Sequence, residues 1–432
     1  MIWNETKECM SRDEMTTLQS KRLVKTVDRV YHNVEYYRKK MQEVGLEPGD
    51  IRGIEDLGKL PYTTKEDLRI TYPFGMFAAP QSEIVRVHAS SGTTGKPTVV
   101  GYTRRDIEIW EECVARAMTM AGITRNDTIQ VAYGYGLFTG GLGAHYGAEF
   151  LGARVVPQST GNTKKLITMM KDFGVTAIAC TPSYLLHIAE TLEEEGELGN
   201  IQLKTAICGA EPWTEAMRLQ MEDKLHISAH DIYGLSEIMG PGVACDCDYH
   251  KGLHVFVDHF LPEIIDPKTL QPVGEDTVGE LVFTTLTKEG LPLIRYRTKD
   301  LTSISYAKCE CGRTLPRLSR FKGRSDDMLI IRGVNVFPGQ VEAALLEMAG
   351  TTPHYLMIVD RQGTLDSLEV QVEVEERFFS DEIRELENLR KKIAHVLQNA
   401  IGLAVNVKLV EPKTIERSMG KTVHVIDKRN LS

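Results

Sequence analysis

One short segment carries the residue types that bind phosphate. It reads Ser90-Ser91-Gly92-Thr93-Thr94-Gly95-Lys96-Pro97 and so combines glycines, hydroxyl side chains and one lysine. In such a loop the backbone N–H groups and the lysine can surround phosphate oxygens. It is not the G-x-x-x-x-G-K-[ST] loop, because a serine stands at the first glycine position and Pro97 replaces the hydroxyl that binds magnesium. Taken alone, the segment is more typical of an exposed turn.

Four further segments with chemically active side chains follow it in order. They are Tyr233-Gly234-Leu235-Ser236-Glu237, Tyr296-Arg297-Thr298-Lys299-Asp300, Gly323-Arg324-Ser325-Asp326-Asp327 and Gly420-Lys421. Each one alone is weak, since a single carboxylate or lysine is usually a solvated surface group. In this order after residues 90–97, they resemble the signatures of the adenylate-forming superfamily, which contains acyl-CoA ligases, luciferases and the adenylation domains of peptide synthetases.

Within that superfamily the chain resembles the family of phenylacetate–CoA ligases. The segments that carry this resemblance are residues 133–143 (YGYGLFTGGLG), 209–213 (GAEPW), 240–243 (GPGV) and 326–338 (DDMLIIRGVNVFP). The likeness runs from Ile2 nearly to the end of the chain. It implies a two-step reaction, in which ATP and an aryl-acetic acid give an acyl-adenylate and pyrophosphate, and the acyl group then passes to coenzyme A with release of AMP.

The resemblance assigns the nucleotide site. Attack of a carboxylate on the α-phosphorus builds negative charge on phosphate oxygens, so catalysis rests on placement and preorganised positive charge. Residues 90–96 would hold the β- and γ-phosphates, Glu237 would bind Mg²⁺, and Asp300 with Arg324 would bind the ribose. The residues expected around the adenine and the α-phosphate are Gly209, Ala210, Glu211, Pro212, Asp231, Ile232, Tyr233, Gly234 and Ser236. For Glu237, Asp300 and Arg324, an exposed acid or a surface ion pair is the alternative.

Two residues are expected to serve the two half-reactions in turn. Lys421 matches the lysine that stabilises the adenylation transition state, and Asp326 matches the hinge about which the small domain turns afterwards. That rotation would withdraw Lys421 and bring residues 333–338 in to admit coenzyme A.

Aromatic residues and glycines mark an acid-binding slot. Tyr133, Tyr135 and Phe138 stand beside Gly140, Gly141 and Gly143, and aromatic walls with small residues between them suit a flat ring. A glycine-rich loop whose aromatic residues fill the core is an equally good interpretation.

Four of the eight cysteines form two C-x-C pairs, Cys245/Cys247 and Cys309/Cys311, and two histidines lie nearby, His250 and His254. In a cytosolic protein such pairs suggest a metal site more than a disulfide. We select Cys247, His254, Cys309 and Cys311 as ligands of a structural Zn²⁺ that pins two distant loops together. Four incidental thiols are the alternative.

The elements that must position these residues alternate between strand and helix. Apolar strands are expected at Ile129–Ala132, Ala153–Val156, Thr176–Cys180 and Thr205–Cys208, with helices at Arg105–Gly122, Lys164–Phe173 and Ser183–Glu194. Alternation of this kind implies a largely parallel sheet covered by helices. A helix with Leu23, Val27, Val30, Val34 and Tyr37 on one face precedes it, and a β-rich meander at Gly279–Thr285, Leu293–Arg297 and Leu301–Ser305 follows.

A smaller unit is expected after Arg324. It should contain a helix between Pro338 and Gly350, a hairpin of Tyr355–Val359 and Leu368–Val374, a helix that is capped by Ser380 or Asp381 and stops at Gly402, and a strand at Val405–Val410. The predicted fold is therefore α/β, with a large N-terminal domain (1–324) of parallel-rich sheets covered by helices plus a β-rich part. A small mobile C-terminal α/β domain (325–432) completes it.

Length and composition agree with this division. A chain of 432 residues with 42% hydrophobic and 26% charged residues is typical of a globular protein of two or three domains. The net charge of −9 argues against a nucleic-acid partner. The polar N-terminus and the absence of a long apolar stretch favour a cytoplasmic protein without a membrane anchor. We expect a homodimer.

Three alternatives stay open. The acid could be indoleacetate, benzoate or a hydroxylated phenylacetate. The chain could be an enzyme of the same fold with another acceptor, such as a deazaflavin adenylyltransferase. It could also be a non-catalytic nucleotide-binding protein, against which the joint presence of Lys421, Glu237 and Asp300 argues.

Overall fold

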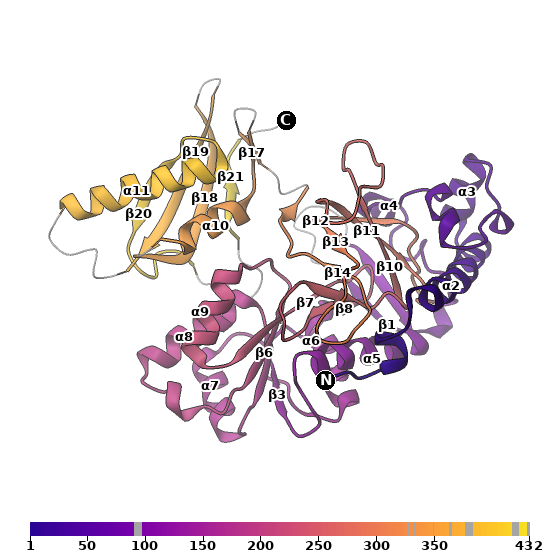
Figure 1. The fold of residues 1–432 in the computed structure, drawn as a ribbon, viewed down its shortest axis with the longest axis horizontal. Coiled ribbons are helices and arrows are strands. Elements are labelled where there is room, and N and C mark those ends of the chain that lie inside the picture. Colours follow the sequence, from indigo (N-terminus) through magenta and orange to yellow (C-terminus); the bar gives the residue numbers. More distant parts are fainter. Residues whose placement is uncertain are drawn as a thin grey trace. The chain divides into compact units, whose positions relative to one another are not determined.

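The computed structural model describes residues 1–89, 97–325, 329–331, 334–348, 350–362, 365–375, 383–416 and 423–429 (Figure 1). It contains two compact units. The larger comprises Met1–Thr181, Gly196–Ala210 and Ile227–Arg320, and the other comprises Pro182–Glu195, Glu211–His226 and Phe321–Ser432. The boundary after Arg324 therefore stays a prediction of where a mobile domain begins. The α/β class with a large and a small part is confirmed.

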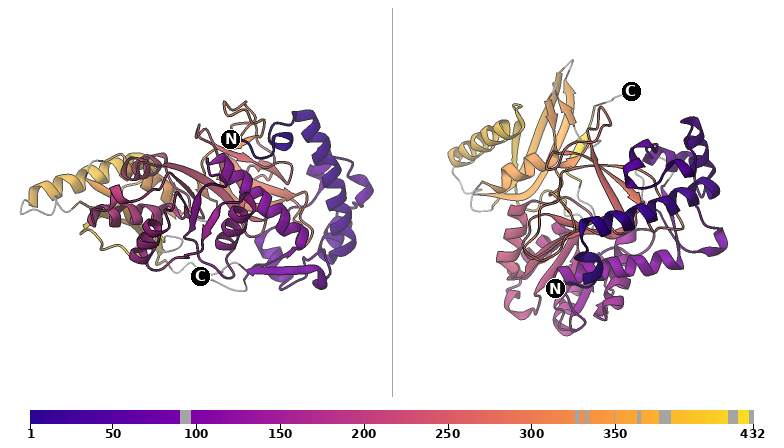
Figure 2. Two further views of the ribbon diagram at one scale, coloured as in Figure 1. Left: turned by 90° about the horizontal axis from the view of Figure 1, so that it is seen from below. Right: turned by 45° about the vertical axis from the view of Figure 1, so that its right-hand side comes forward.

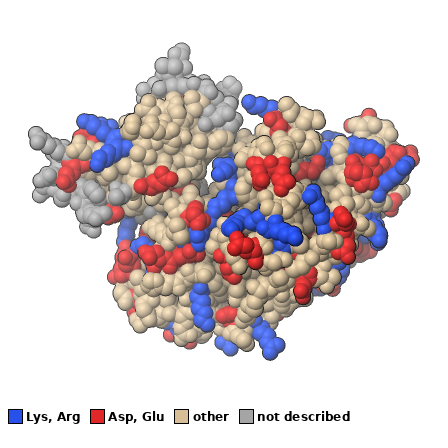
Figure 3. All heavy atoms as spheres, viewed as in Figure 1, with Lys and Arg blue, Asp and Glu red and all other residues tan. Residues whose placement is uncertain are grey.

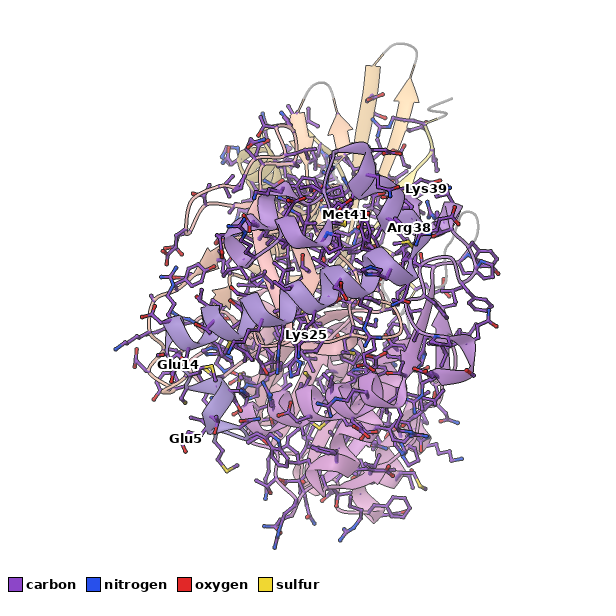
Figure 4. The ribbon with its side chains drawn as sticks, turned by 90° about the vertical axis from the view of Figure 1, so that its right-hand side faces the viewer. Glu5, Glu14, Lys25, Arg38, Lys39 and Met41 are labelled. Atoms are coloured by element: carbon purple, nitrogen blue, oxygen red, sulfur yellow. The ribbon has the colours of Figure 1, made fainter. Side chains whose placement is uncertain are left out.

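The N-terminal helices line one side of the larger unit (Figure 2). They are α1 (Glu5–Glu8), α2 (Arg12–Asn33) and α3 (Glu35–Glu43), and Figure 4 views α2 and α3 with their exposed side chains. The single helix expected through Tyr37 is wrong, because Val34 has an extended backbone (φ −119°, ψ 107°) that separates α2 from α3. The predicted apolar face is nevertheless buried, since Leu23 and Tyr37 are at most 1% exposed. Gly45 ends α3 with φ +70°.

Short elements follow these helices. They are η1 (Pro48–Asp50), η2 (Ile54–Lys59), α4 (Lys65–Ile70) and η3 (Gln81–Glu83). The strands β1 (Ile84–Ala89) and β2 (Val99–Thr103) then form an antiparallel hairpin in which Ala89 pairs with Val99. The predicted phosphate loop, residues 90–96, joins these two strands and lies outside the described residues.

A sheet of nine strands organises the larger unit, in the order β13-β14-β9-β8-β7-β6-β5-β3-β4. Its parallel half consists of β3 (Thr128–Val131), β4 (Arg154–Val156), β5 (Ala177–Cys180), β6 (Thr205–Gly209) and β7 (Ser228–Leu235). The antiparallel half consists of β8 (Gly240–Asp246), β9 (Leu253–Val255), β14 (Arg317–Leu318) and β13 (Ile304–Ser305). The four predicted parallel strands are confirmed to within one residue at each end.

One helix precedes the parallel strands and four connect them, and the sequence predicted the first, third and fourth of these five. They are α5 (Arg104–Met120), α6 (Thr139–Leu151), α7 (Thr163–Asp172), α8 (Pro182–Glu194) and α9 (Glu215–Leu225), with η4 (Leu198–Asn200) after α8. Helices α5 and α6 pack closely because a Cβ on Gly143 would lie 2.6 Å from the Trp110 ring. The Trp110 indole also donates to Pro241 O at 2.8 Å, which fixes α5 against β8.

An antiparallel meander of β10 (Phe260–Ile265), β11 (Gly279–Thr285) and β12 (Tyr296–Thr302) completes this unit. The strand predicted at Leu293–Arg297 is wrong over its first half. There the N–H groups of Leu293, Ile294 and Arg295 donate to the hydroxyls of Thr285, Tyr37 and Thr284, respectively, instead of to a neighbouring strand. The last predicted strand is also divided, since Ile304–Ser305 pairs with β14 in the nine-stranded sheet.

The C-terminal part has its own sheet, in the order β20-β19-β18-β21. The predicted hairpin is confirmed and longer than expected, as β18 (Thr351–Gln362) and β19 (Leu365–Val374), while β20 (Asn406–Val410) and β21 (Val425–Asp427) pair with it in parallel. Helices α10 (Pro338–Leu346) and α11 (Ile383–Ile401) are also as predicted, and Gly402 has φ +72°. Ser380 and Asp381 lie outside the described residues. The remaining strands are β15 (Gly323–Arg324), β16 (Leu329–Ile331) and β17 (Val334–Val336).

The surface has mixed charge. Acidic and basic side chains lie intermingled over the face shown in Figure 3. Within the described residues, no helix combines the length and the apolar character needed to cross a membrane.

The close approach of β7 and β8 requires a glycine at Gly234, the next-to-last residue of β7. A Cβ at this position would lie 1.7 Å from Gly240 O, a backbone atom of β8 that cannot move aside. We therefore predict that Gly234→Ala lowers the free energy of unfolding by about 1–3 kcal/mol, the usual cost of overpacking. Chemical unfolding checks this value. In the control Gly58→Ala, the added Cβ meets nothing within 4 Å, and the change should stay within about 0.5 kcal/mol. Equal effects of both substitutions would contradict the close β7–β8 approach.

Candidate active site

A tight turn follows β7 at the carboxyl end of the parallel strands. It consists of Ser236–Met239, which we call the Glu237 turn. The backbone N–H groups of its last two residues, Ile238 and Met239, both donate to Leu235 O. Glu237 is only 6% exposed. One of its carboxylate oxygens lies 3.7 Å from Lys65 Nζ. The Ser236 hydroxyl lies 3.0 Å from that of Thr139, the first residue of α6.

The structure brings two of the predicted motifs together. Tyr233 OH donates to Asp300 Oδ2 at 2.6 Å, so the end of β7 and the middle of β12 meet. The Tyr233 ring stacks against Phe283 of β11, with centroids 6.4 Å apart. Asp300 N also donates to Thr298 Oγ1. Tyr233 thus holds the carboxylate that is predicted to bind ribose, and Thr298 holds the backbone of the same residue.

The end of β6 lies against β7. Gly209 pairs with Ile232, and a Cβ at Gly209 would lie 2.2 Å from Ile232 O, so only glycine permits this approach. Ala210 follows with φ +74°. Asp231 N donates to Asp246 Oδ1 of β8 at 2.9 Å. The predicted nucleotide residues of the larger unit therefore occupy adjacent strand ends.

The other predicted nucleotide residues belong to the second unit. Glu211 accepts the Ser183 N–H within that unit at 2.7 Å, and Pro212 follows it. Arg324 lies in β15. Nine of the predicted residues, namely residues 90–96, Asp326 and Lys421, are outside the described residues.

The residues predicted for the acid slot differ in burial and in their contacts. Tyr133 is buried and its hydroxyl donates to Cys180 O at 2.6 Å, so this ring is anchored to β5. Tyr135 OH contacts His145 Nδ1 at 3.2 Å, and burial raises the pKa of Tyr135 to about 12. Phe138 is 44% exposed. A Cβ on Gly141 would lie 2.6 Å from Gly134 O, so the segment folds back tightly on the start of α6.

The four predicted zinc ligands lie together in the larger unit. The ligand atoms of Cys247, His254, Cys309 and Cys311 are all within 4.8 Å of one another. The Cys247 and Cys309 sulfurs are 3.7 Å apart, and Cys311 Sγ is 3.5 Å from His254 Nε2. In contrast, Cys245 contacts Ala117 O with its thiol. The remaining candidate, His250, contacts Asp246 Oδ2 at 2.8 Å.

The three thiols of this cluster stabilise a positive charge beside them. Burial alone would lower the pKa of His254, but hydrogen bonds to Cys247, Cys309 and Cys311 raise it to about 10. Burial raises the pKa of Cys311, and the opposing contact with His254 brings it down to about 5. Three thiols and one imidazole form the donor set of a structural Zn²⁺ site.

The N-terminal segment holds the loop that carries two of these cysteines. Arg313 Nε pairs with Glu8 Oε2 at 2.5 Å, and both side chains are buried. Cys9 Sγ contacts Gly312 O at 3.5 Å, and Thr314 N donates to Glu8 O at 3.0 Å. Residues more than 300 positions apart in sequence thus form one local structure.

Sequence reasoning missed two residues near these sites. His145 faces Tyr135, and its i,i+4 contact with Glu149 could have placed it on one face of α6. Lys288 is 1% exposed and donates to two carbonyls of the Glu237 turn. Burial lowers its pKa to about 8, against the attraction of Asp106 and Glu237. No local pattern marks Lys288 in the sequence.

The sequence and the fold are similar to those of known proteins. Residues 26–286 match the model of the AMP-binding enzyme family, and residues 333–429 match that of the AMP-binding enzyme C-terminal domain. The phenylacetate–coenzyme A ligase of Thermus thermophilus is 48% identical, with coverage of 99% of this chain and 100% of that protein. The enzyme of the same name from Escherichia coli is 49% identical, with coverage of 98% and 97%. A crystal structure of a 2-hydroxyisobutyryl-CoA ligase superposes with a TM-score of 0.92 at 30% identity, covering 98% of this chain and 92% of that one.

Nearly full-length similarity at this level shows the family. The chain belongs to the AMP-binding enzymes, in the branch of the phenylacetate–coenzyme A ligases. It is an AMP-forming acid–CoA ligase.

Proposed function

We propose that this enzyme uses ATP to convert phenylacetate to phenylacetyl-adenylate and then transfers the acyl group to coenzyme A. The observation that carries the proposal is the contact between Tyr233 and Asp300 beside the Glu237 turn, which joins two nucleotide-binding motifs at one end of the sheet. The names and high identity of the relatives support phenylacetate as the acid. Indoleacetate or benzoate as the acid, or adenylation of a deazaflavin, is the alternative.

Glu237 would hold the Mg²⁺ that accompanies ATP. Carboxylate oxygen is a preferred ligand of this hard cation. Glu237 is 6% exposed and lies near the ammonium group of Lys65, so a charged ligand here would have charged neighbours. When bound, Mg²⁺ would neutralise charge on the phosphate oxygens. Asp300 would accept the ribose hydroxyls with support from Arg324, and residues 90–96 would surround the β- and γ-phosphates. The adenine and the α-phosphate would lie between Gly209–Pro212 and Asp231–Gly234.

The acid would enter a slot beside α6. Tyr135 and Phe138 would form its walls, Tyr133 would support them from the sheet, and Gly141 would leave room for the ring. Because Thr139 of α6 contacts Ser236 of the Glu237 turn, the carboxylate of an acid in this slot would face the nucleotide.

The second half-reaction requires a change at the same site. Lys421 would stabilise the charge that develops during adenylation, and rotation about Asp326 would then remove it and admit coenzyme A. One site would thus serve both steps in sequence.

We also propose a structural Zn²⁺ bound by Cys247, His254, Cys309 and Cys311. The donor set and the spacing within 4.8 Å support a four-coordinate site. The metal would tie the β8–β9 connection to residues 309–311. A homodimer located in the cytoplasm completes the proposal.

The products distinguish the adenylate mechanism from its alternatives. Incubation with phenylacetate, ATP, Mg²⁺ and coenzyme A should give phenylacetyl-CoA, AMP and pyrophosphate, and pyrophosphate release should depend on the acid before coenzyme A is added. Chromatography of the nucleotides together with a pyrophosphate assay measures both. Release of ADP and phosphate would rule the mechanism out, and activity only with another acid or acceptor would select an alternative.

The two half-reactions can be separated by substitution. Lys421→Ala should slow adenylation by roughly 10²–10³-fold, the size of losing one preorganised contact, yet should convert synthetic phenylacetyl-adenylate and coenzyme A to thioester at nearly the normal rate. Asp326→Pro should form adenylate and then stall, because proline restricts the φ rotation of the hinge. Single-turnover assays follow each step. Equal loss of both steps in both variants contradicts the alternation of domains.

Metal analysis tests the zinc proposal. Protein purified without chelators should contain about one Zn²⁺ per chain, and Cys309→Ser should lose the metal and lower the melting temperature while KM values of the folded fraction stay near normal. Cys245→Ser is the matched control, because this buried thiol lies two positions from Cys247 but contacts Ala117. It should retain the metal. A metal-free wild-type protein with the same stability after Cys309→Ser would show that the thiols are incidental.

A further inference from the structure

The Glu237 turn exposes a row of carbonyl groups toward the protein interior. Ile238 and Met239 both donate to Leu235 O, so the turn is a single helical turn that does not continue into a helix. The last carbonyls of such a turn have no partners within it. Ile238 and Met239 are fully buried, so water cannot satisfy their carbonyls at low cost.

Two buried side chains contact all four carbonyls of this turn, and the single hydroxyl proton of Tyr102 is shared between two of them. Tyr102 OH contacts Ser236 O at 3.3 Å and Met239 O at 3.0 Å. Lys288 Nζ contacts Glu237 O at 3.1 Å and Ile238 O at 2.9 Å. The backbone carbonyl of each residue of the turn, Glu237 included, is therefore in contact with a buried side chain.

The ammonium is held in position from several directions. Lys288 Nζ lies 4.6 Å from the centre of the Tyr102 ring, and Trp110 stacks on the same ring at 5.1 Å. Asp106 accepts the N–H groups of Glu289 and Gly290, which directly follow Lys288, at 2.7 and 2.8 Å. The Lys288 backbone is thus fixed to the start of α5.

Burial of an ammonium group carries a large desolvation cost, which hydrogen bonds and nearby negative charge must offset. Lys288 is 1% exposed, and no carboxylate within the described residues forms an ion pair with it under 4.0 Å. A helical turn has the negative end of its dipole at its carbonyls, where a cation is stabilised. The contacts of Lys288 are therefore those of a lysine that stabilises the carbonyl end of the turn.

We propose that Lys288 is a positioning residue for Glu237. By fixing the carbonyls of Glu237 and Ile238, it sets the Glu237 carboxylate in the place where this residue would bind the divalent cation of the nucleotide. This inference rests on the proposed role of Glu237. Tyr102 acts in the same way at the two ends of the turn.

The test measures the Mg²⁺ dependence of acid-dependent pyrophosphate release. Lys288→Met keeps the length and apolar stem of the side chain but removes the donor. It should raise the Mg²⁺ concentration for half-maximal rate by about 10–100-fold, the usual effect of residues that orient a metal ligand. Excess Mg²⁺ should restore most of the rate, and the KM for the acid should change little. Lys288→Gln, which keeps one donor group, should lie between Met and the wild type.

Two comparisons exclude a merely structural role. Gln19→Leu removes another buried donor to a backbone carbonyl, Val257 O, and should leave the Mg²⁺ dependence unchanged even where stability falls. In a Glu237→Gln background, Lys288→Met should add little further shift, since both residues act on one cation.

The outcomes are distinct. A folded Lys288→Met variant with the wild-type Mg²⁺ dependence, or effects additive with Glu237→Gln, overturns the inference alone. Where Lys288→Met fails to fold, Tyr102→Phe decides, because it removes only the hydroxyl at Ser236 O and Met239 O. A shift in the same direction supports the proposal, and none overturns it. Wild-type protein without Mg²⁺-dependent pyrophosphate release overturns both this inference and the proposed function.

Discussion

The chain must reverse direction where the nine-stranded sheet changes from parallel to antiparallel, and its carbonyls at that reversal have to be satisfied inside the protein. The reversal occupies four residues, Ser236–Met239, between β7 and β8. Its tightness brings Gly234 against Gly240, and its carbonyls are bound by Tyr102 and Lys288. Ligands of α/β sheets bind at the carboxyl ends of strands. The same reversal therefore brings the two strands close together at the edge of the sheet where Glu237 is proposed to act.

The cysteine–histidine cluster is linked to β7, the strand that carries several of the predicted nucleotide residues. Asp246 accepts the N–H of Asp231 from β7 and contacts His250, and Cys247 follows it directly. Movement of the β8–β9 connection would thus be transmitted to the strand that carries Tyr233. The proposed structural cation would fix this connection and stabilise β7 without touching the nucleotide, unlike the cation proposed at Glu237.

Contiguous patterns in the sequence predicted much of the molecule, and contacts between distant segments explain what they did not predict. Four of the parallel strands and helices α5, α7 and α8 follow from local periodicity, whereas α6 and α9 were not predicted. The motifs at Tyr233 and Asp300 are short enough to be seen in one stretch. The strand expected at Leu293–Arg297 failed because hydroxyls of Thr284, Thr285 and Tyr37 capture its N–H groups. Lys288 was missed because the carbonyls it binds lie about 50 positions earlier in the chain.

The pairing of Glu8 with Arg313 has a consequence for the order of synthesis. Glu8 is fully buried, and its partner lies 305 positions later. While the chain emerges from the ribosome, Asn4 and Trp3 can meet Glu112 and Phe150 early, but Glu8 cannot meet its partner until Arg313 has been made. This late closure increases the contact order of the larger unit. The buried ion pair of Glu8 is thus among the later native contacts of its segment to form.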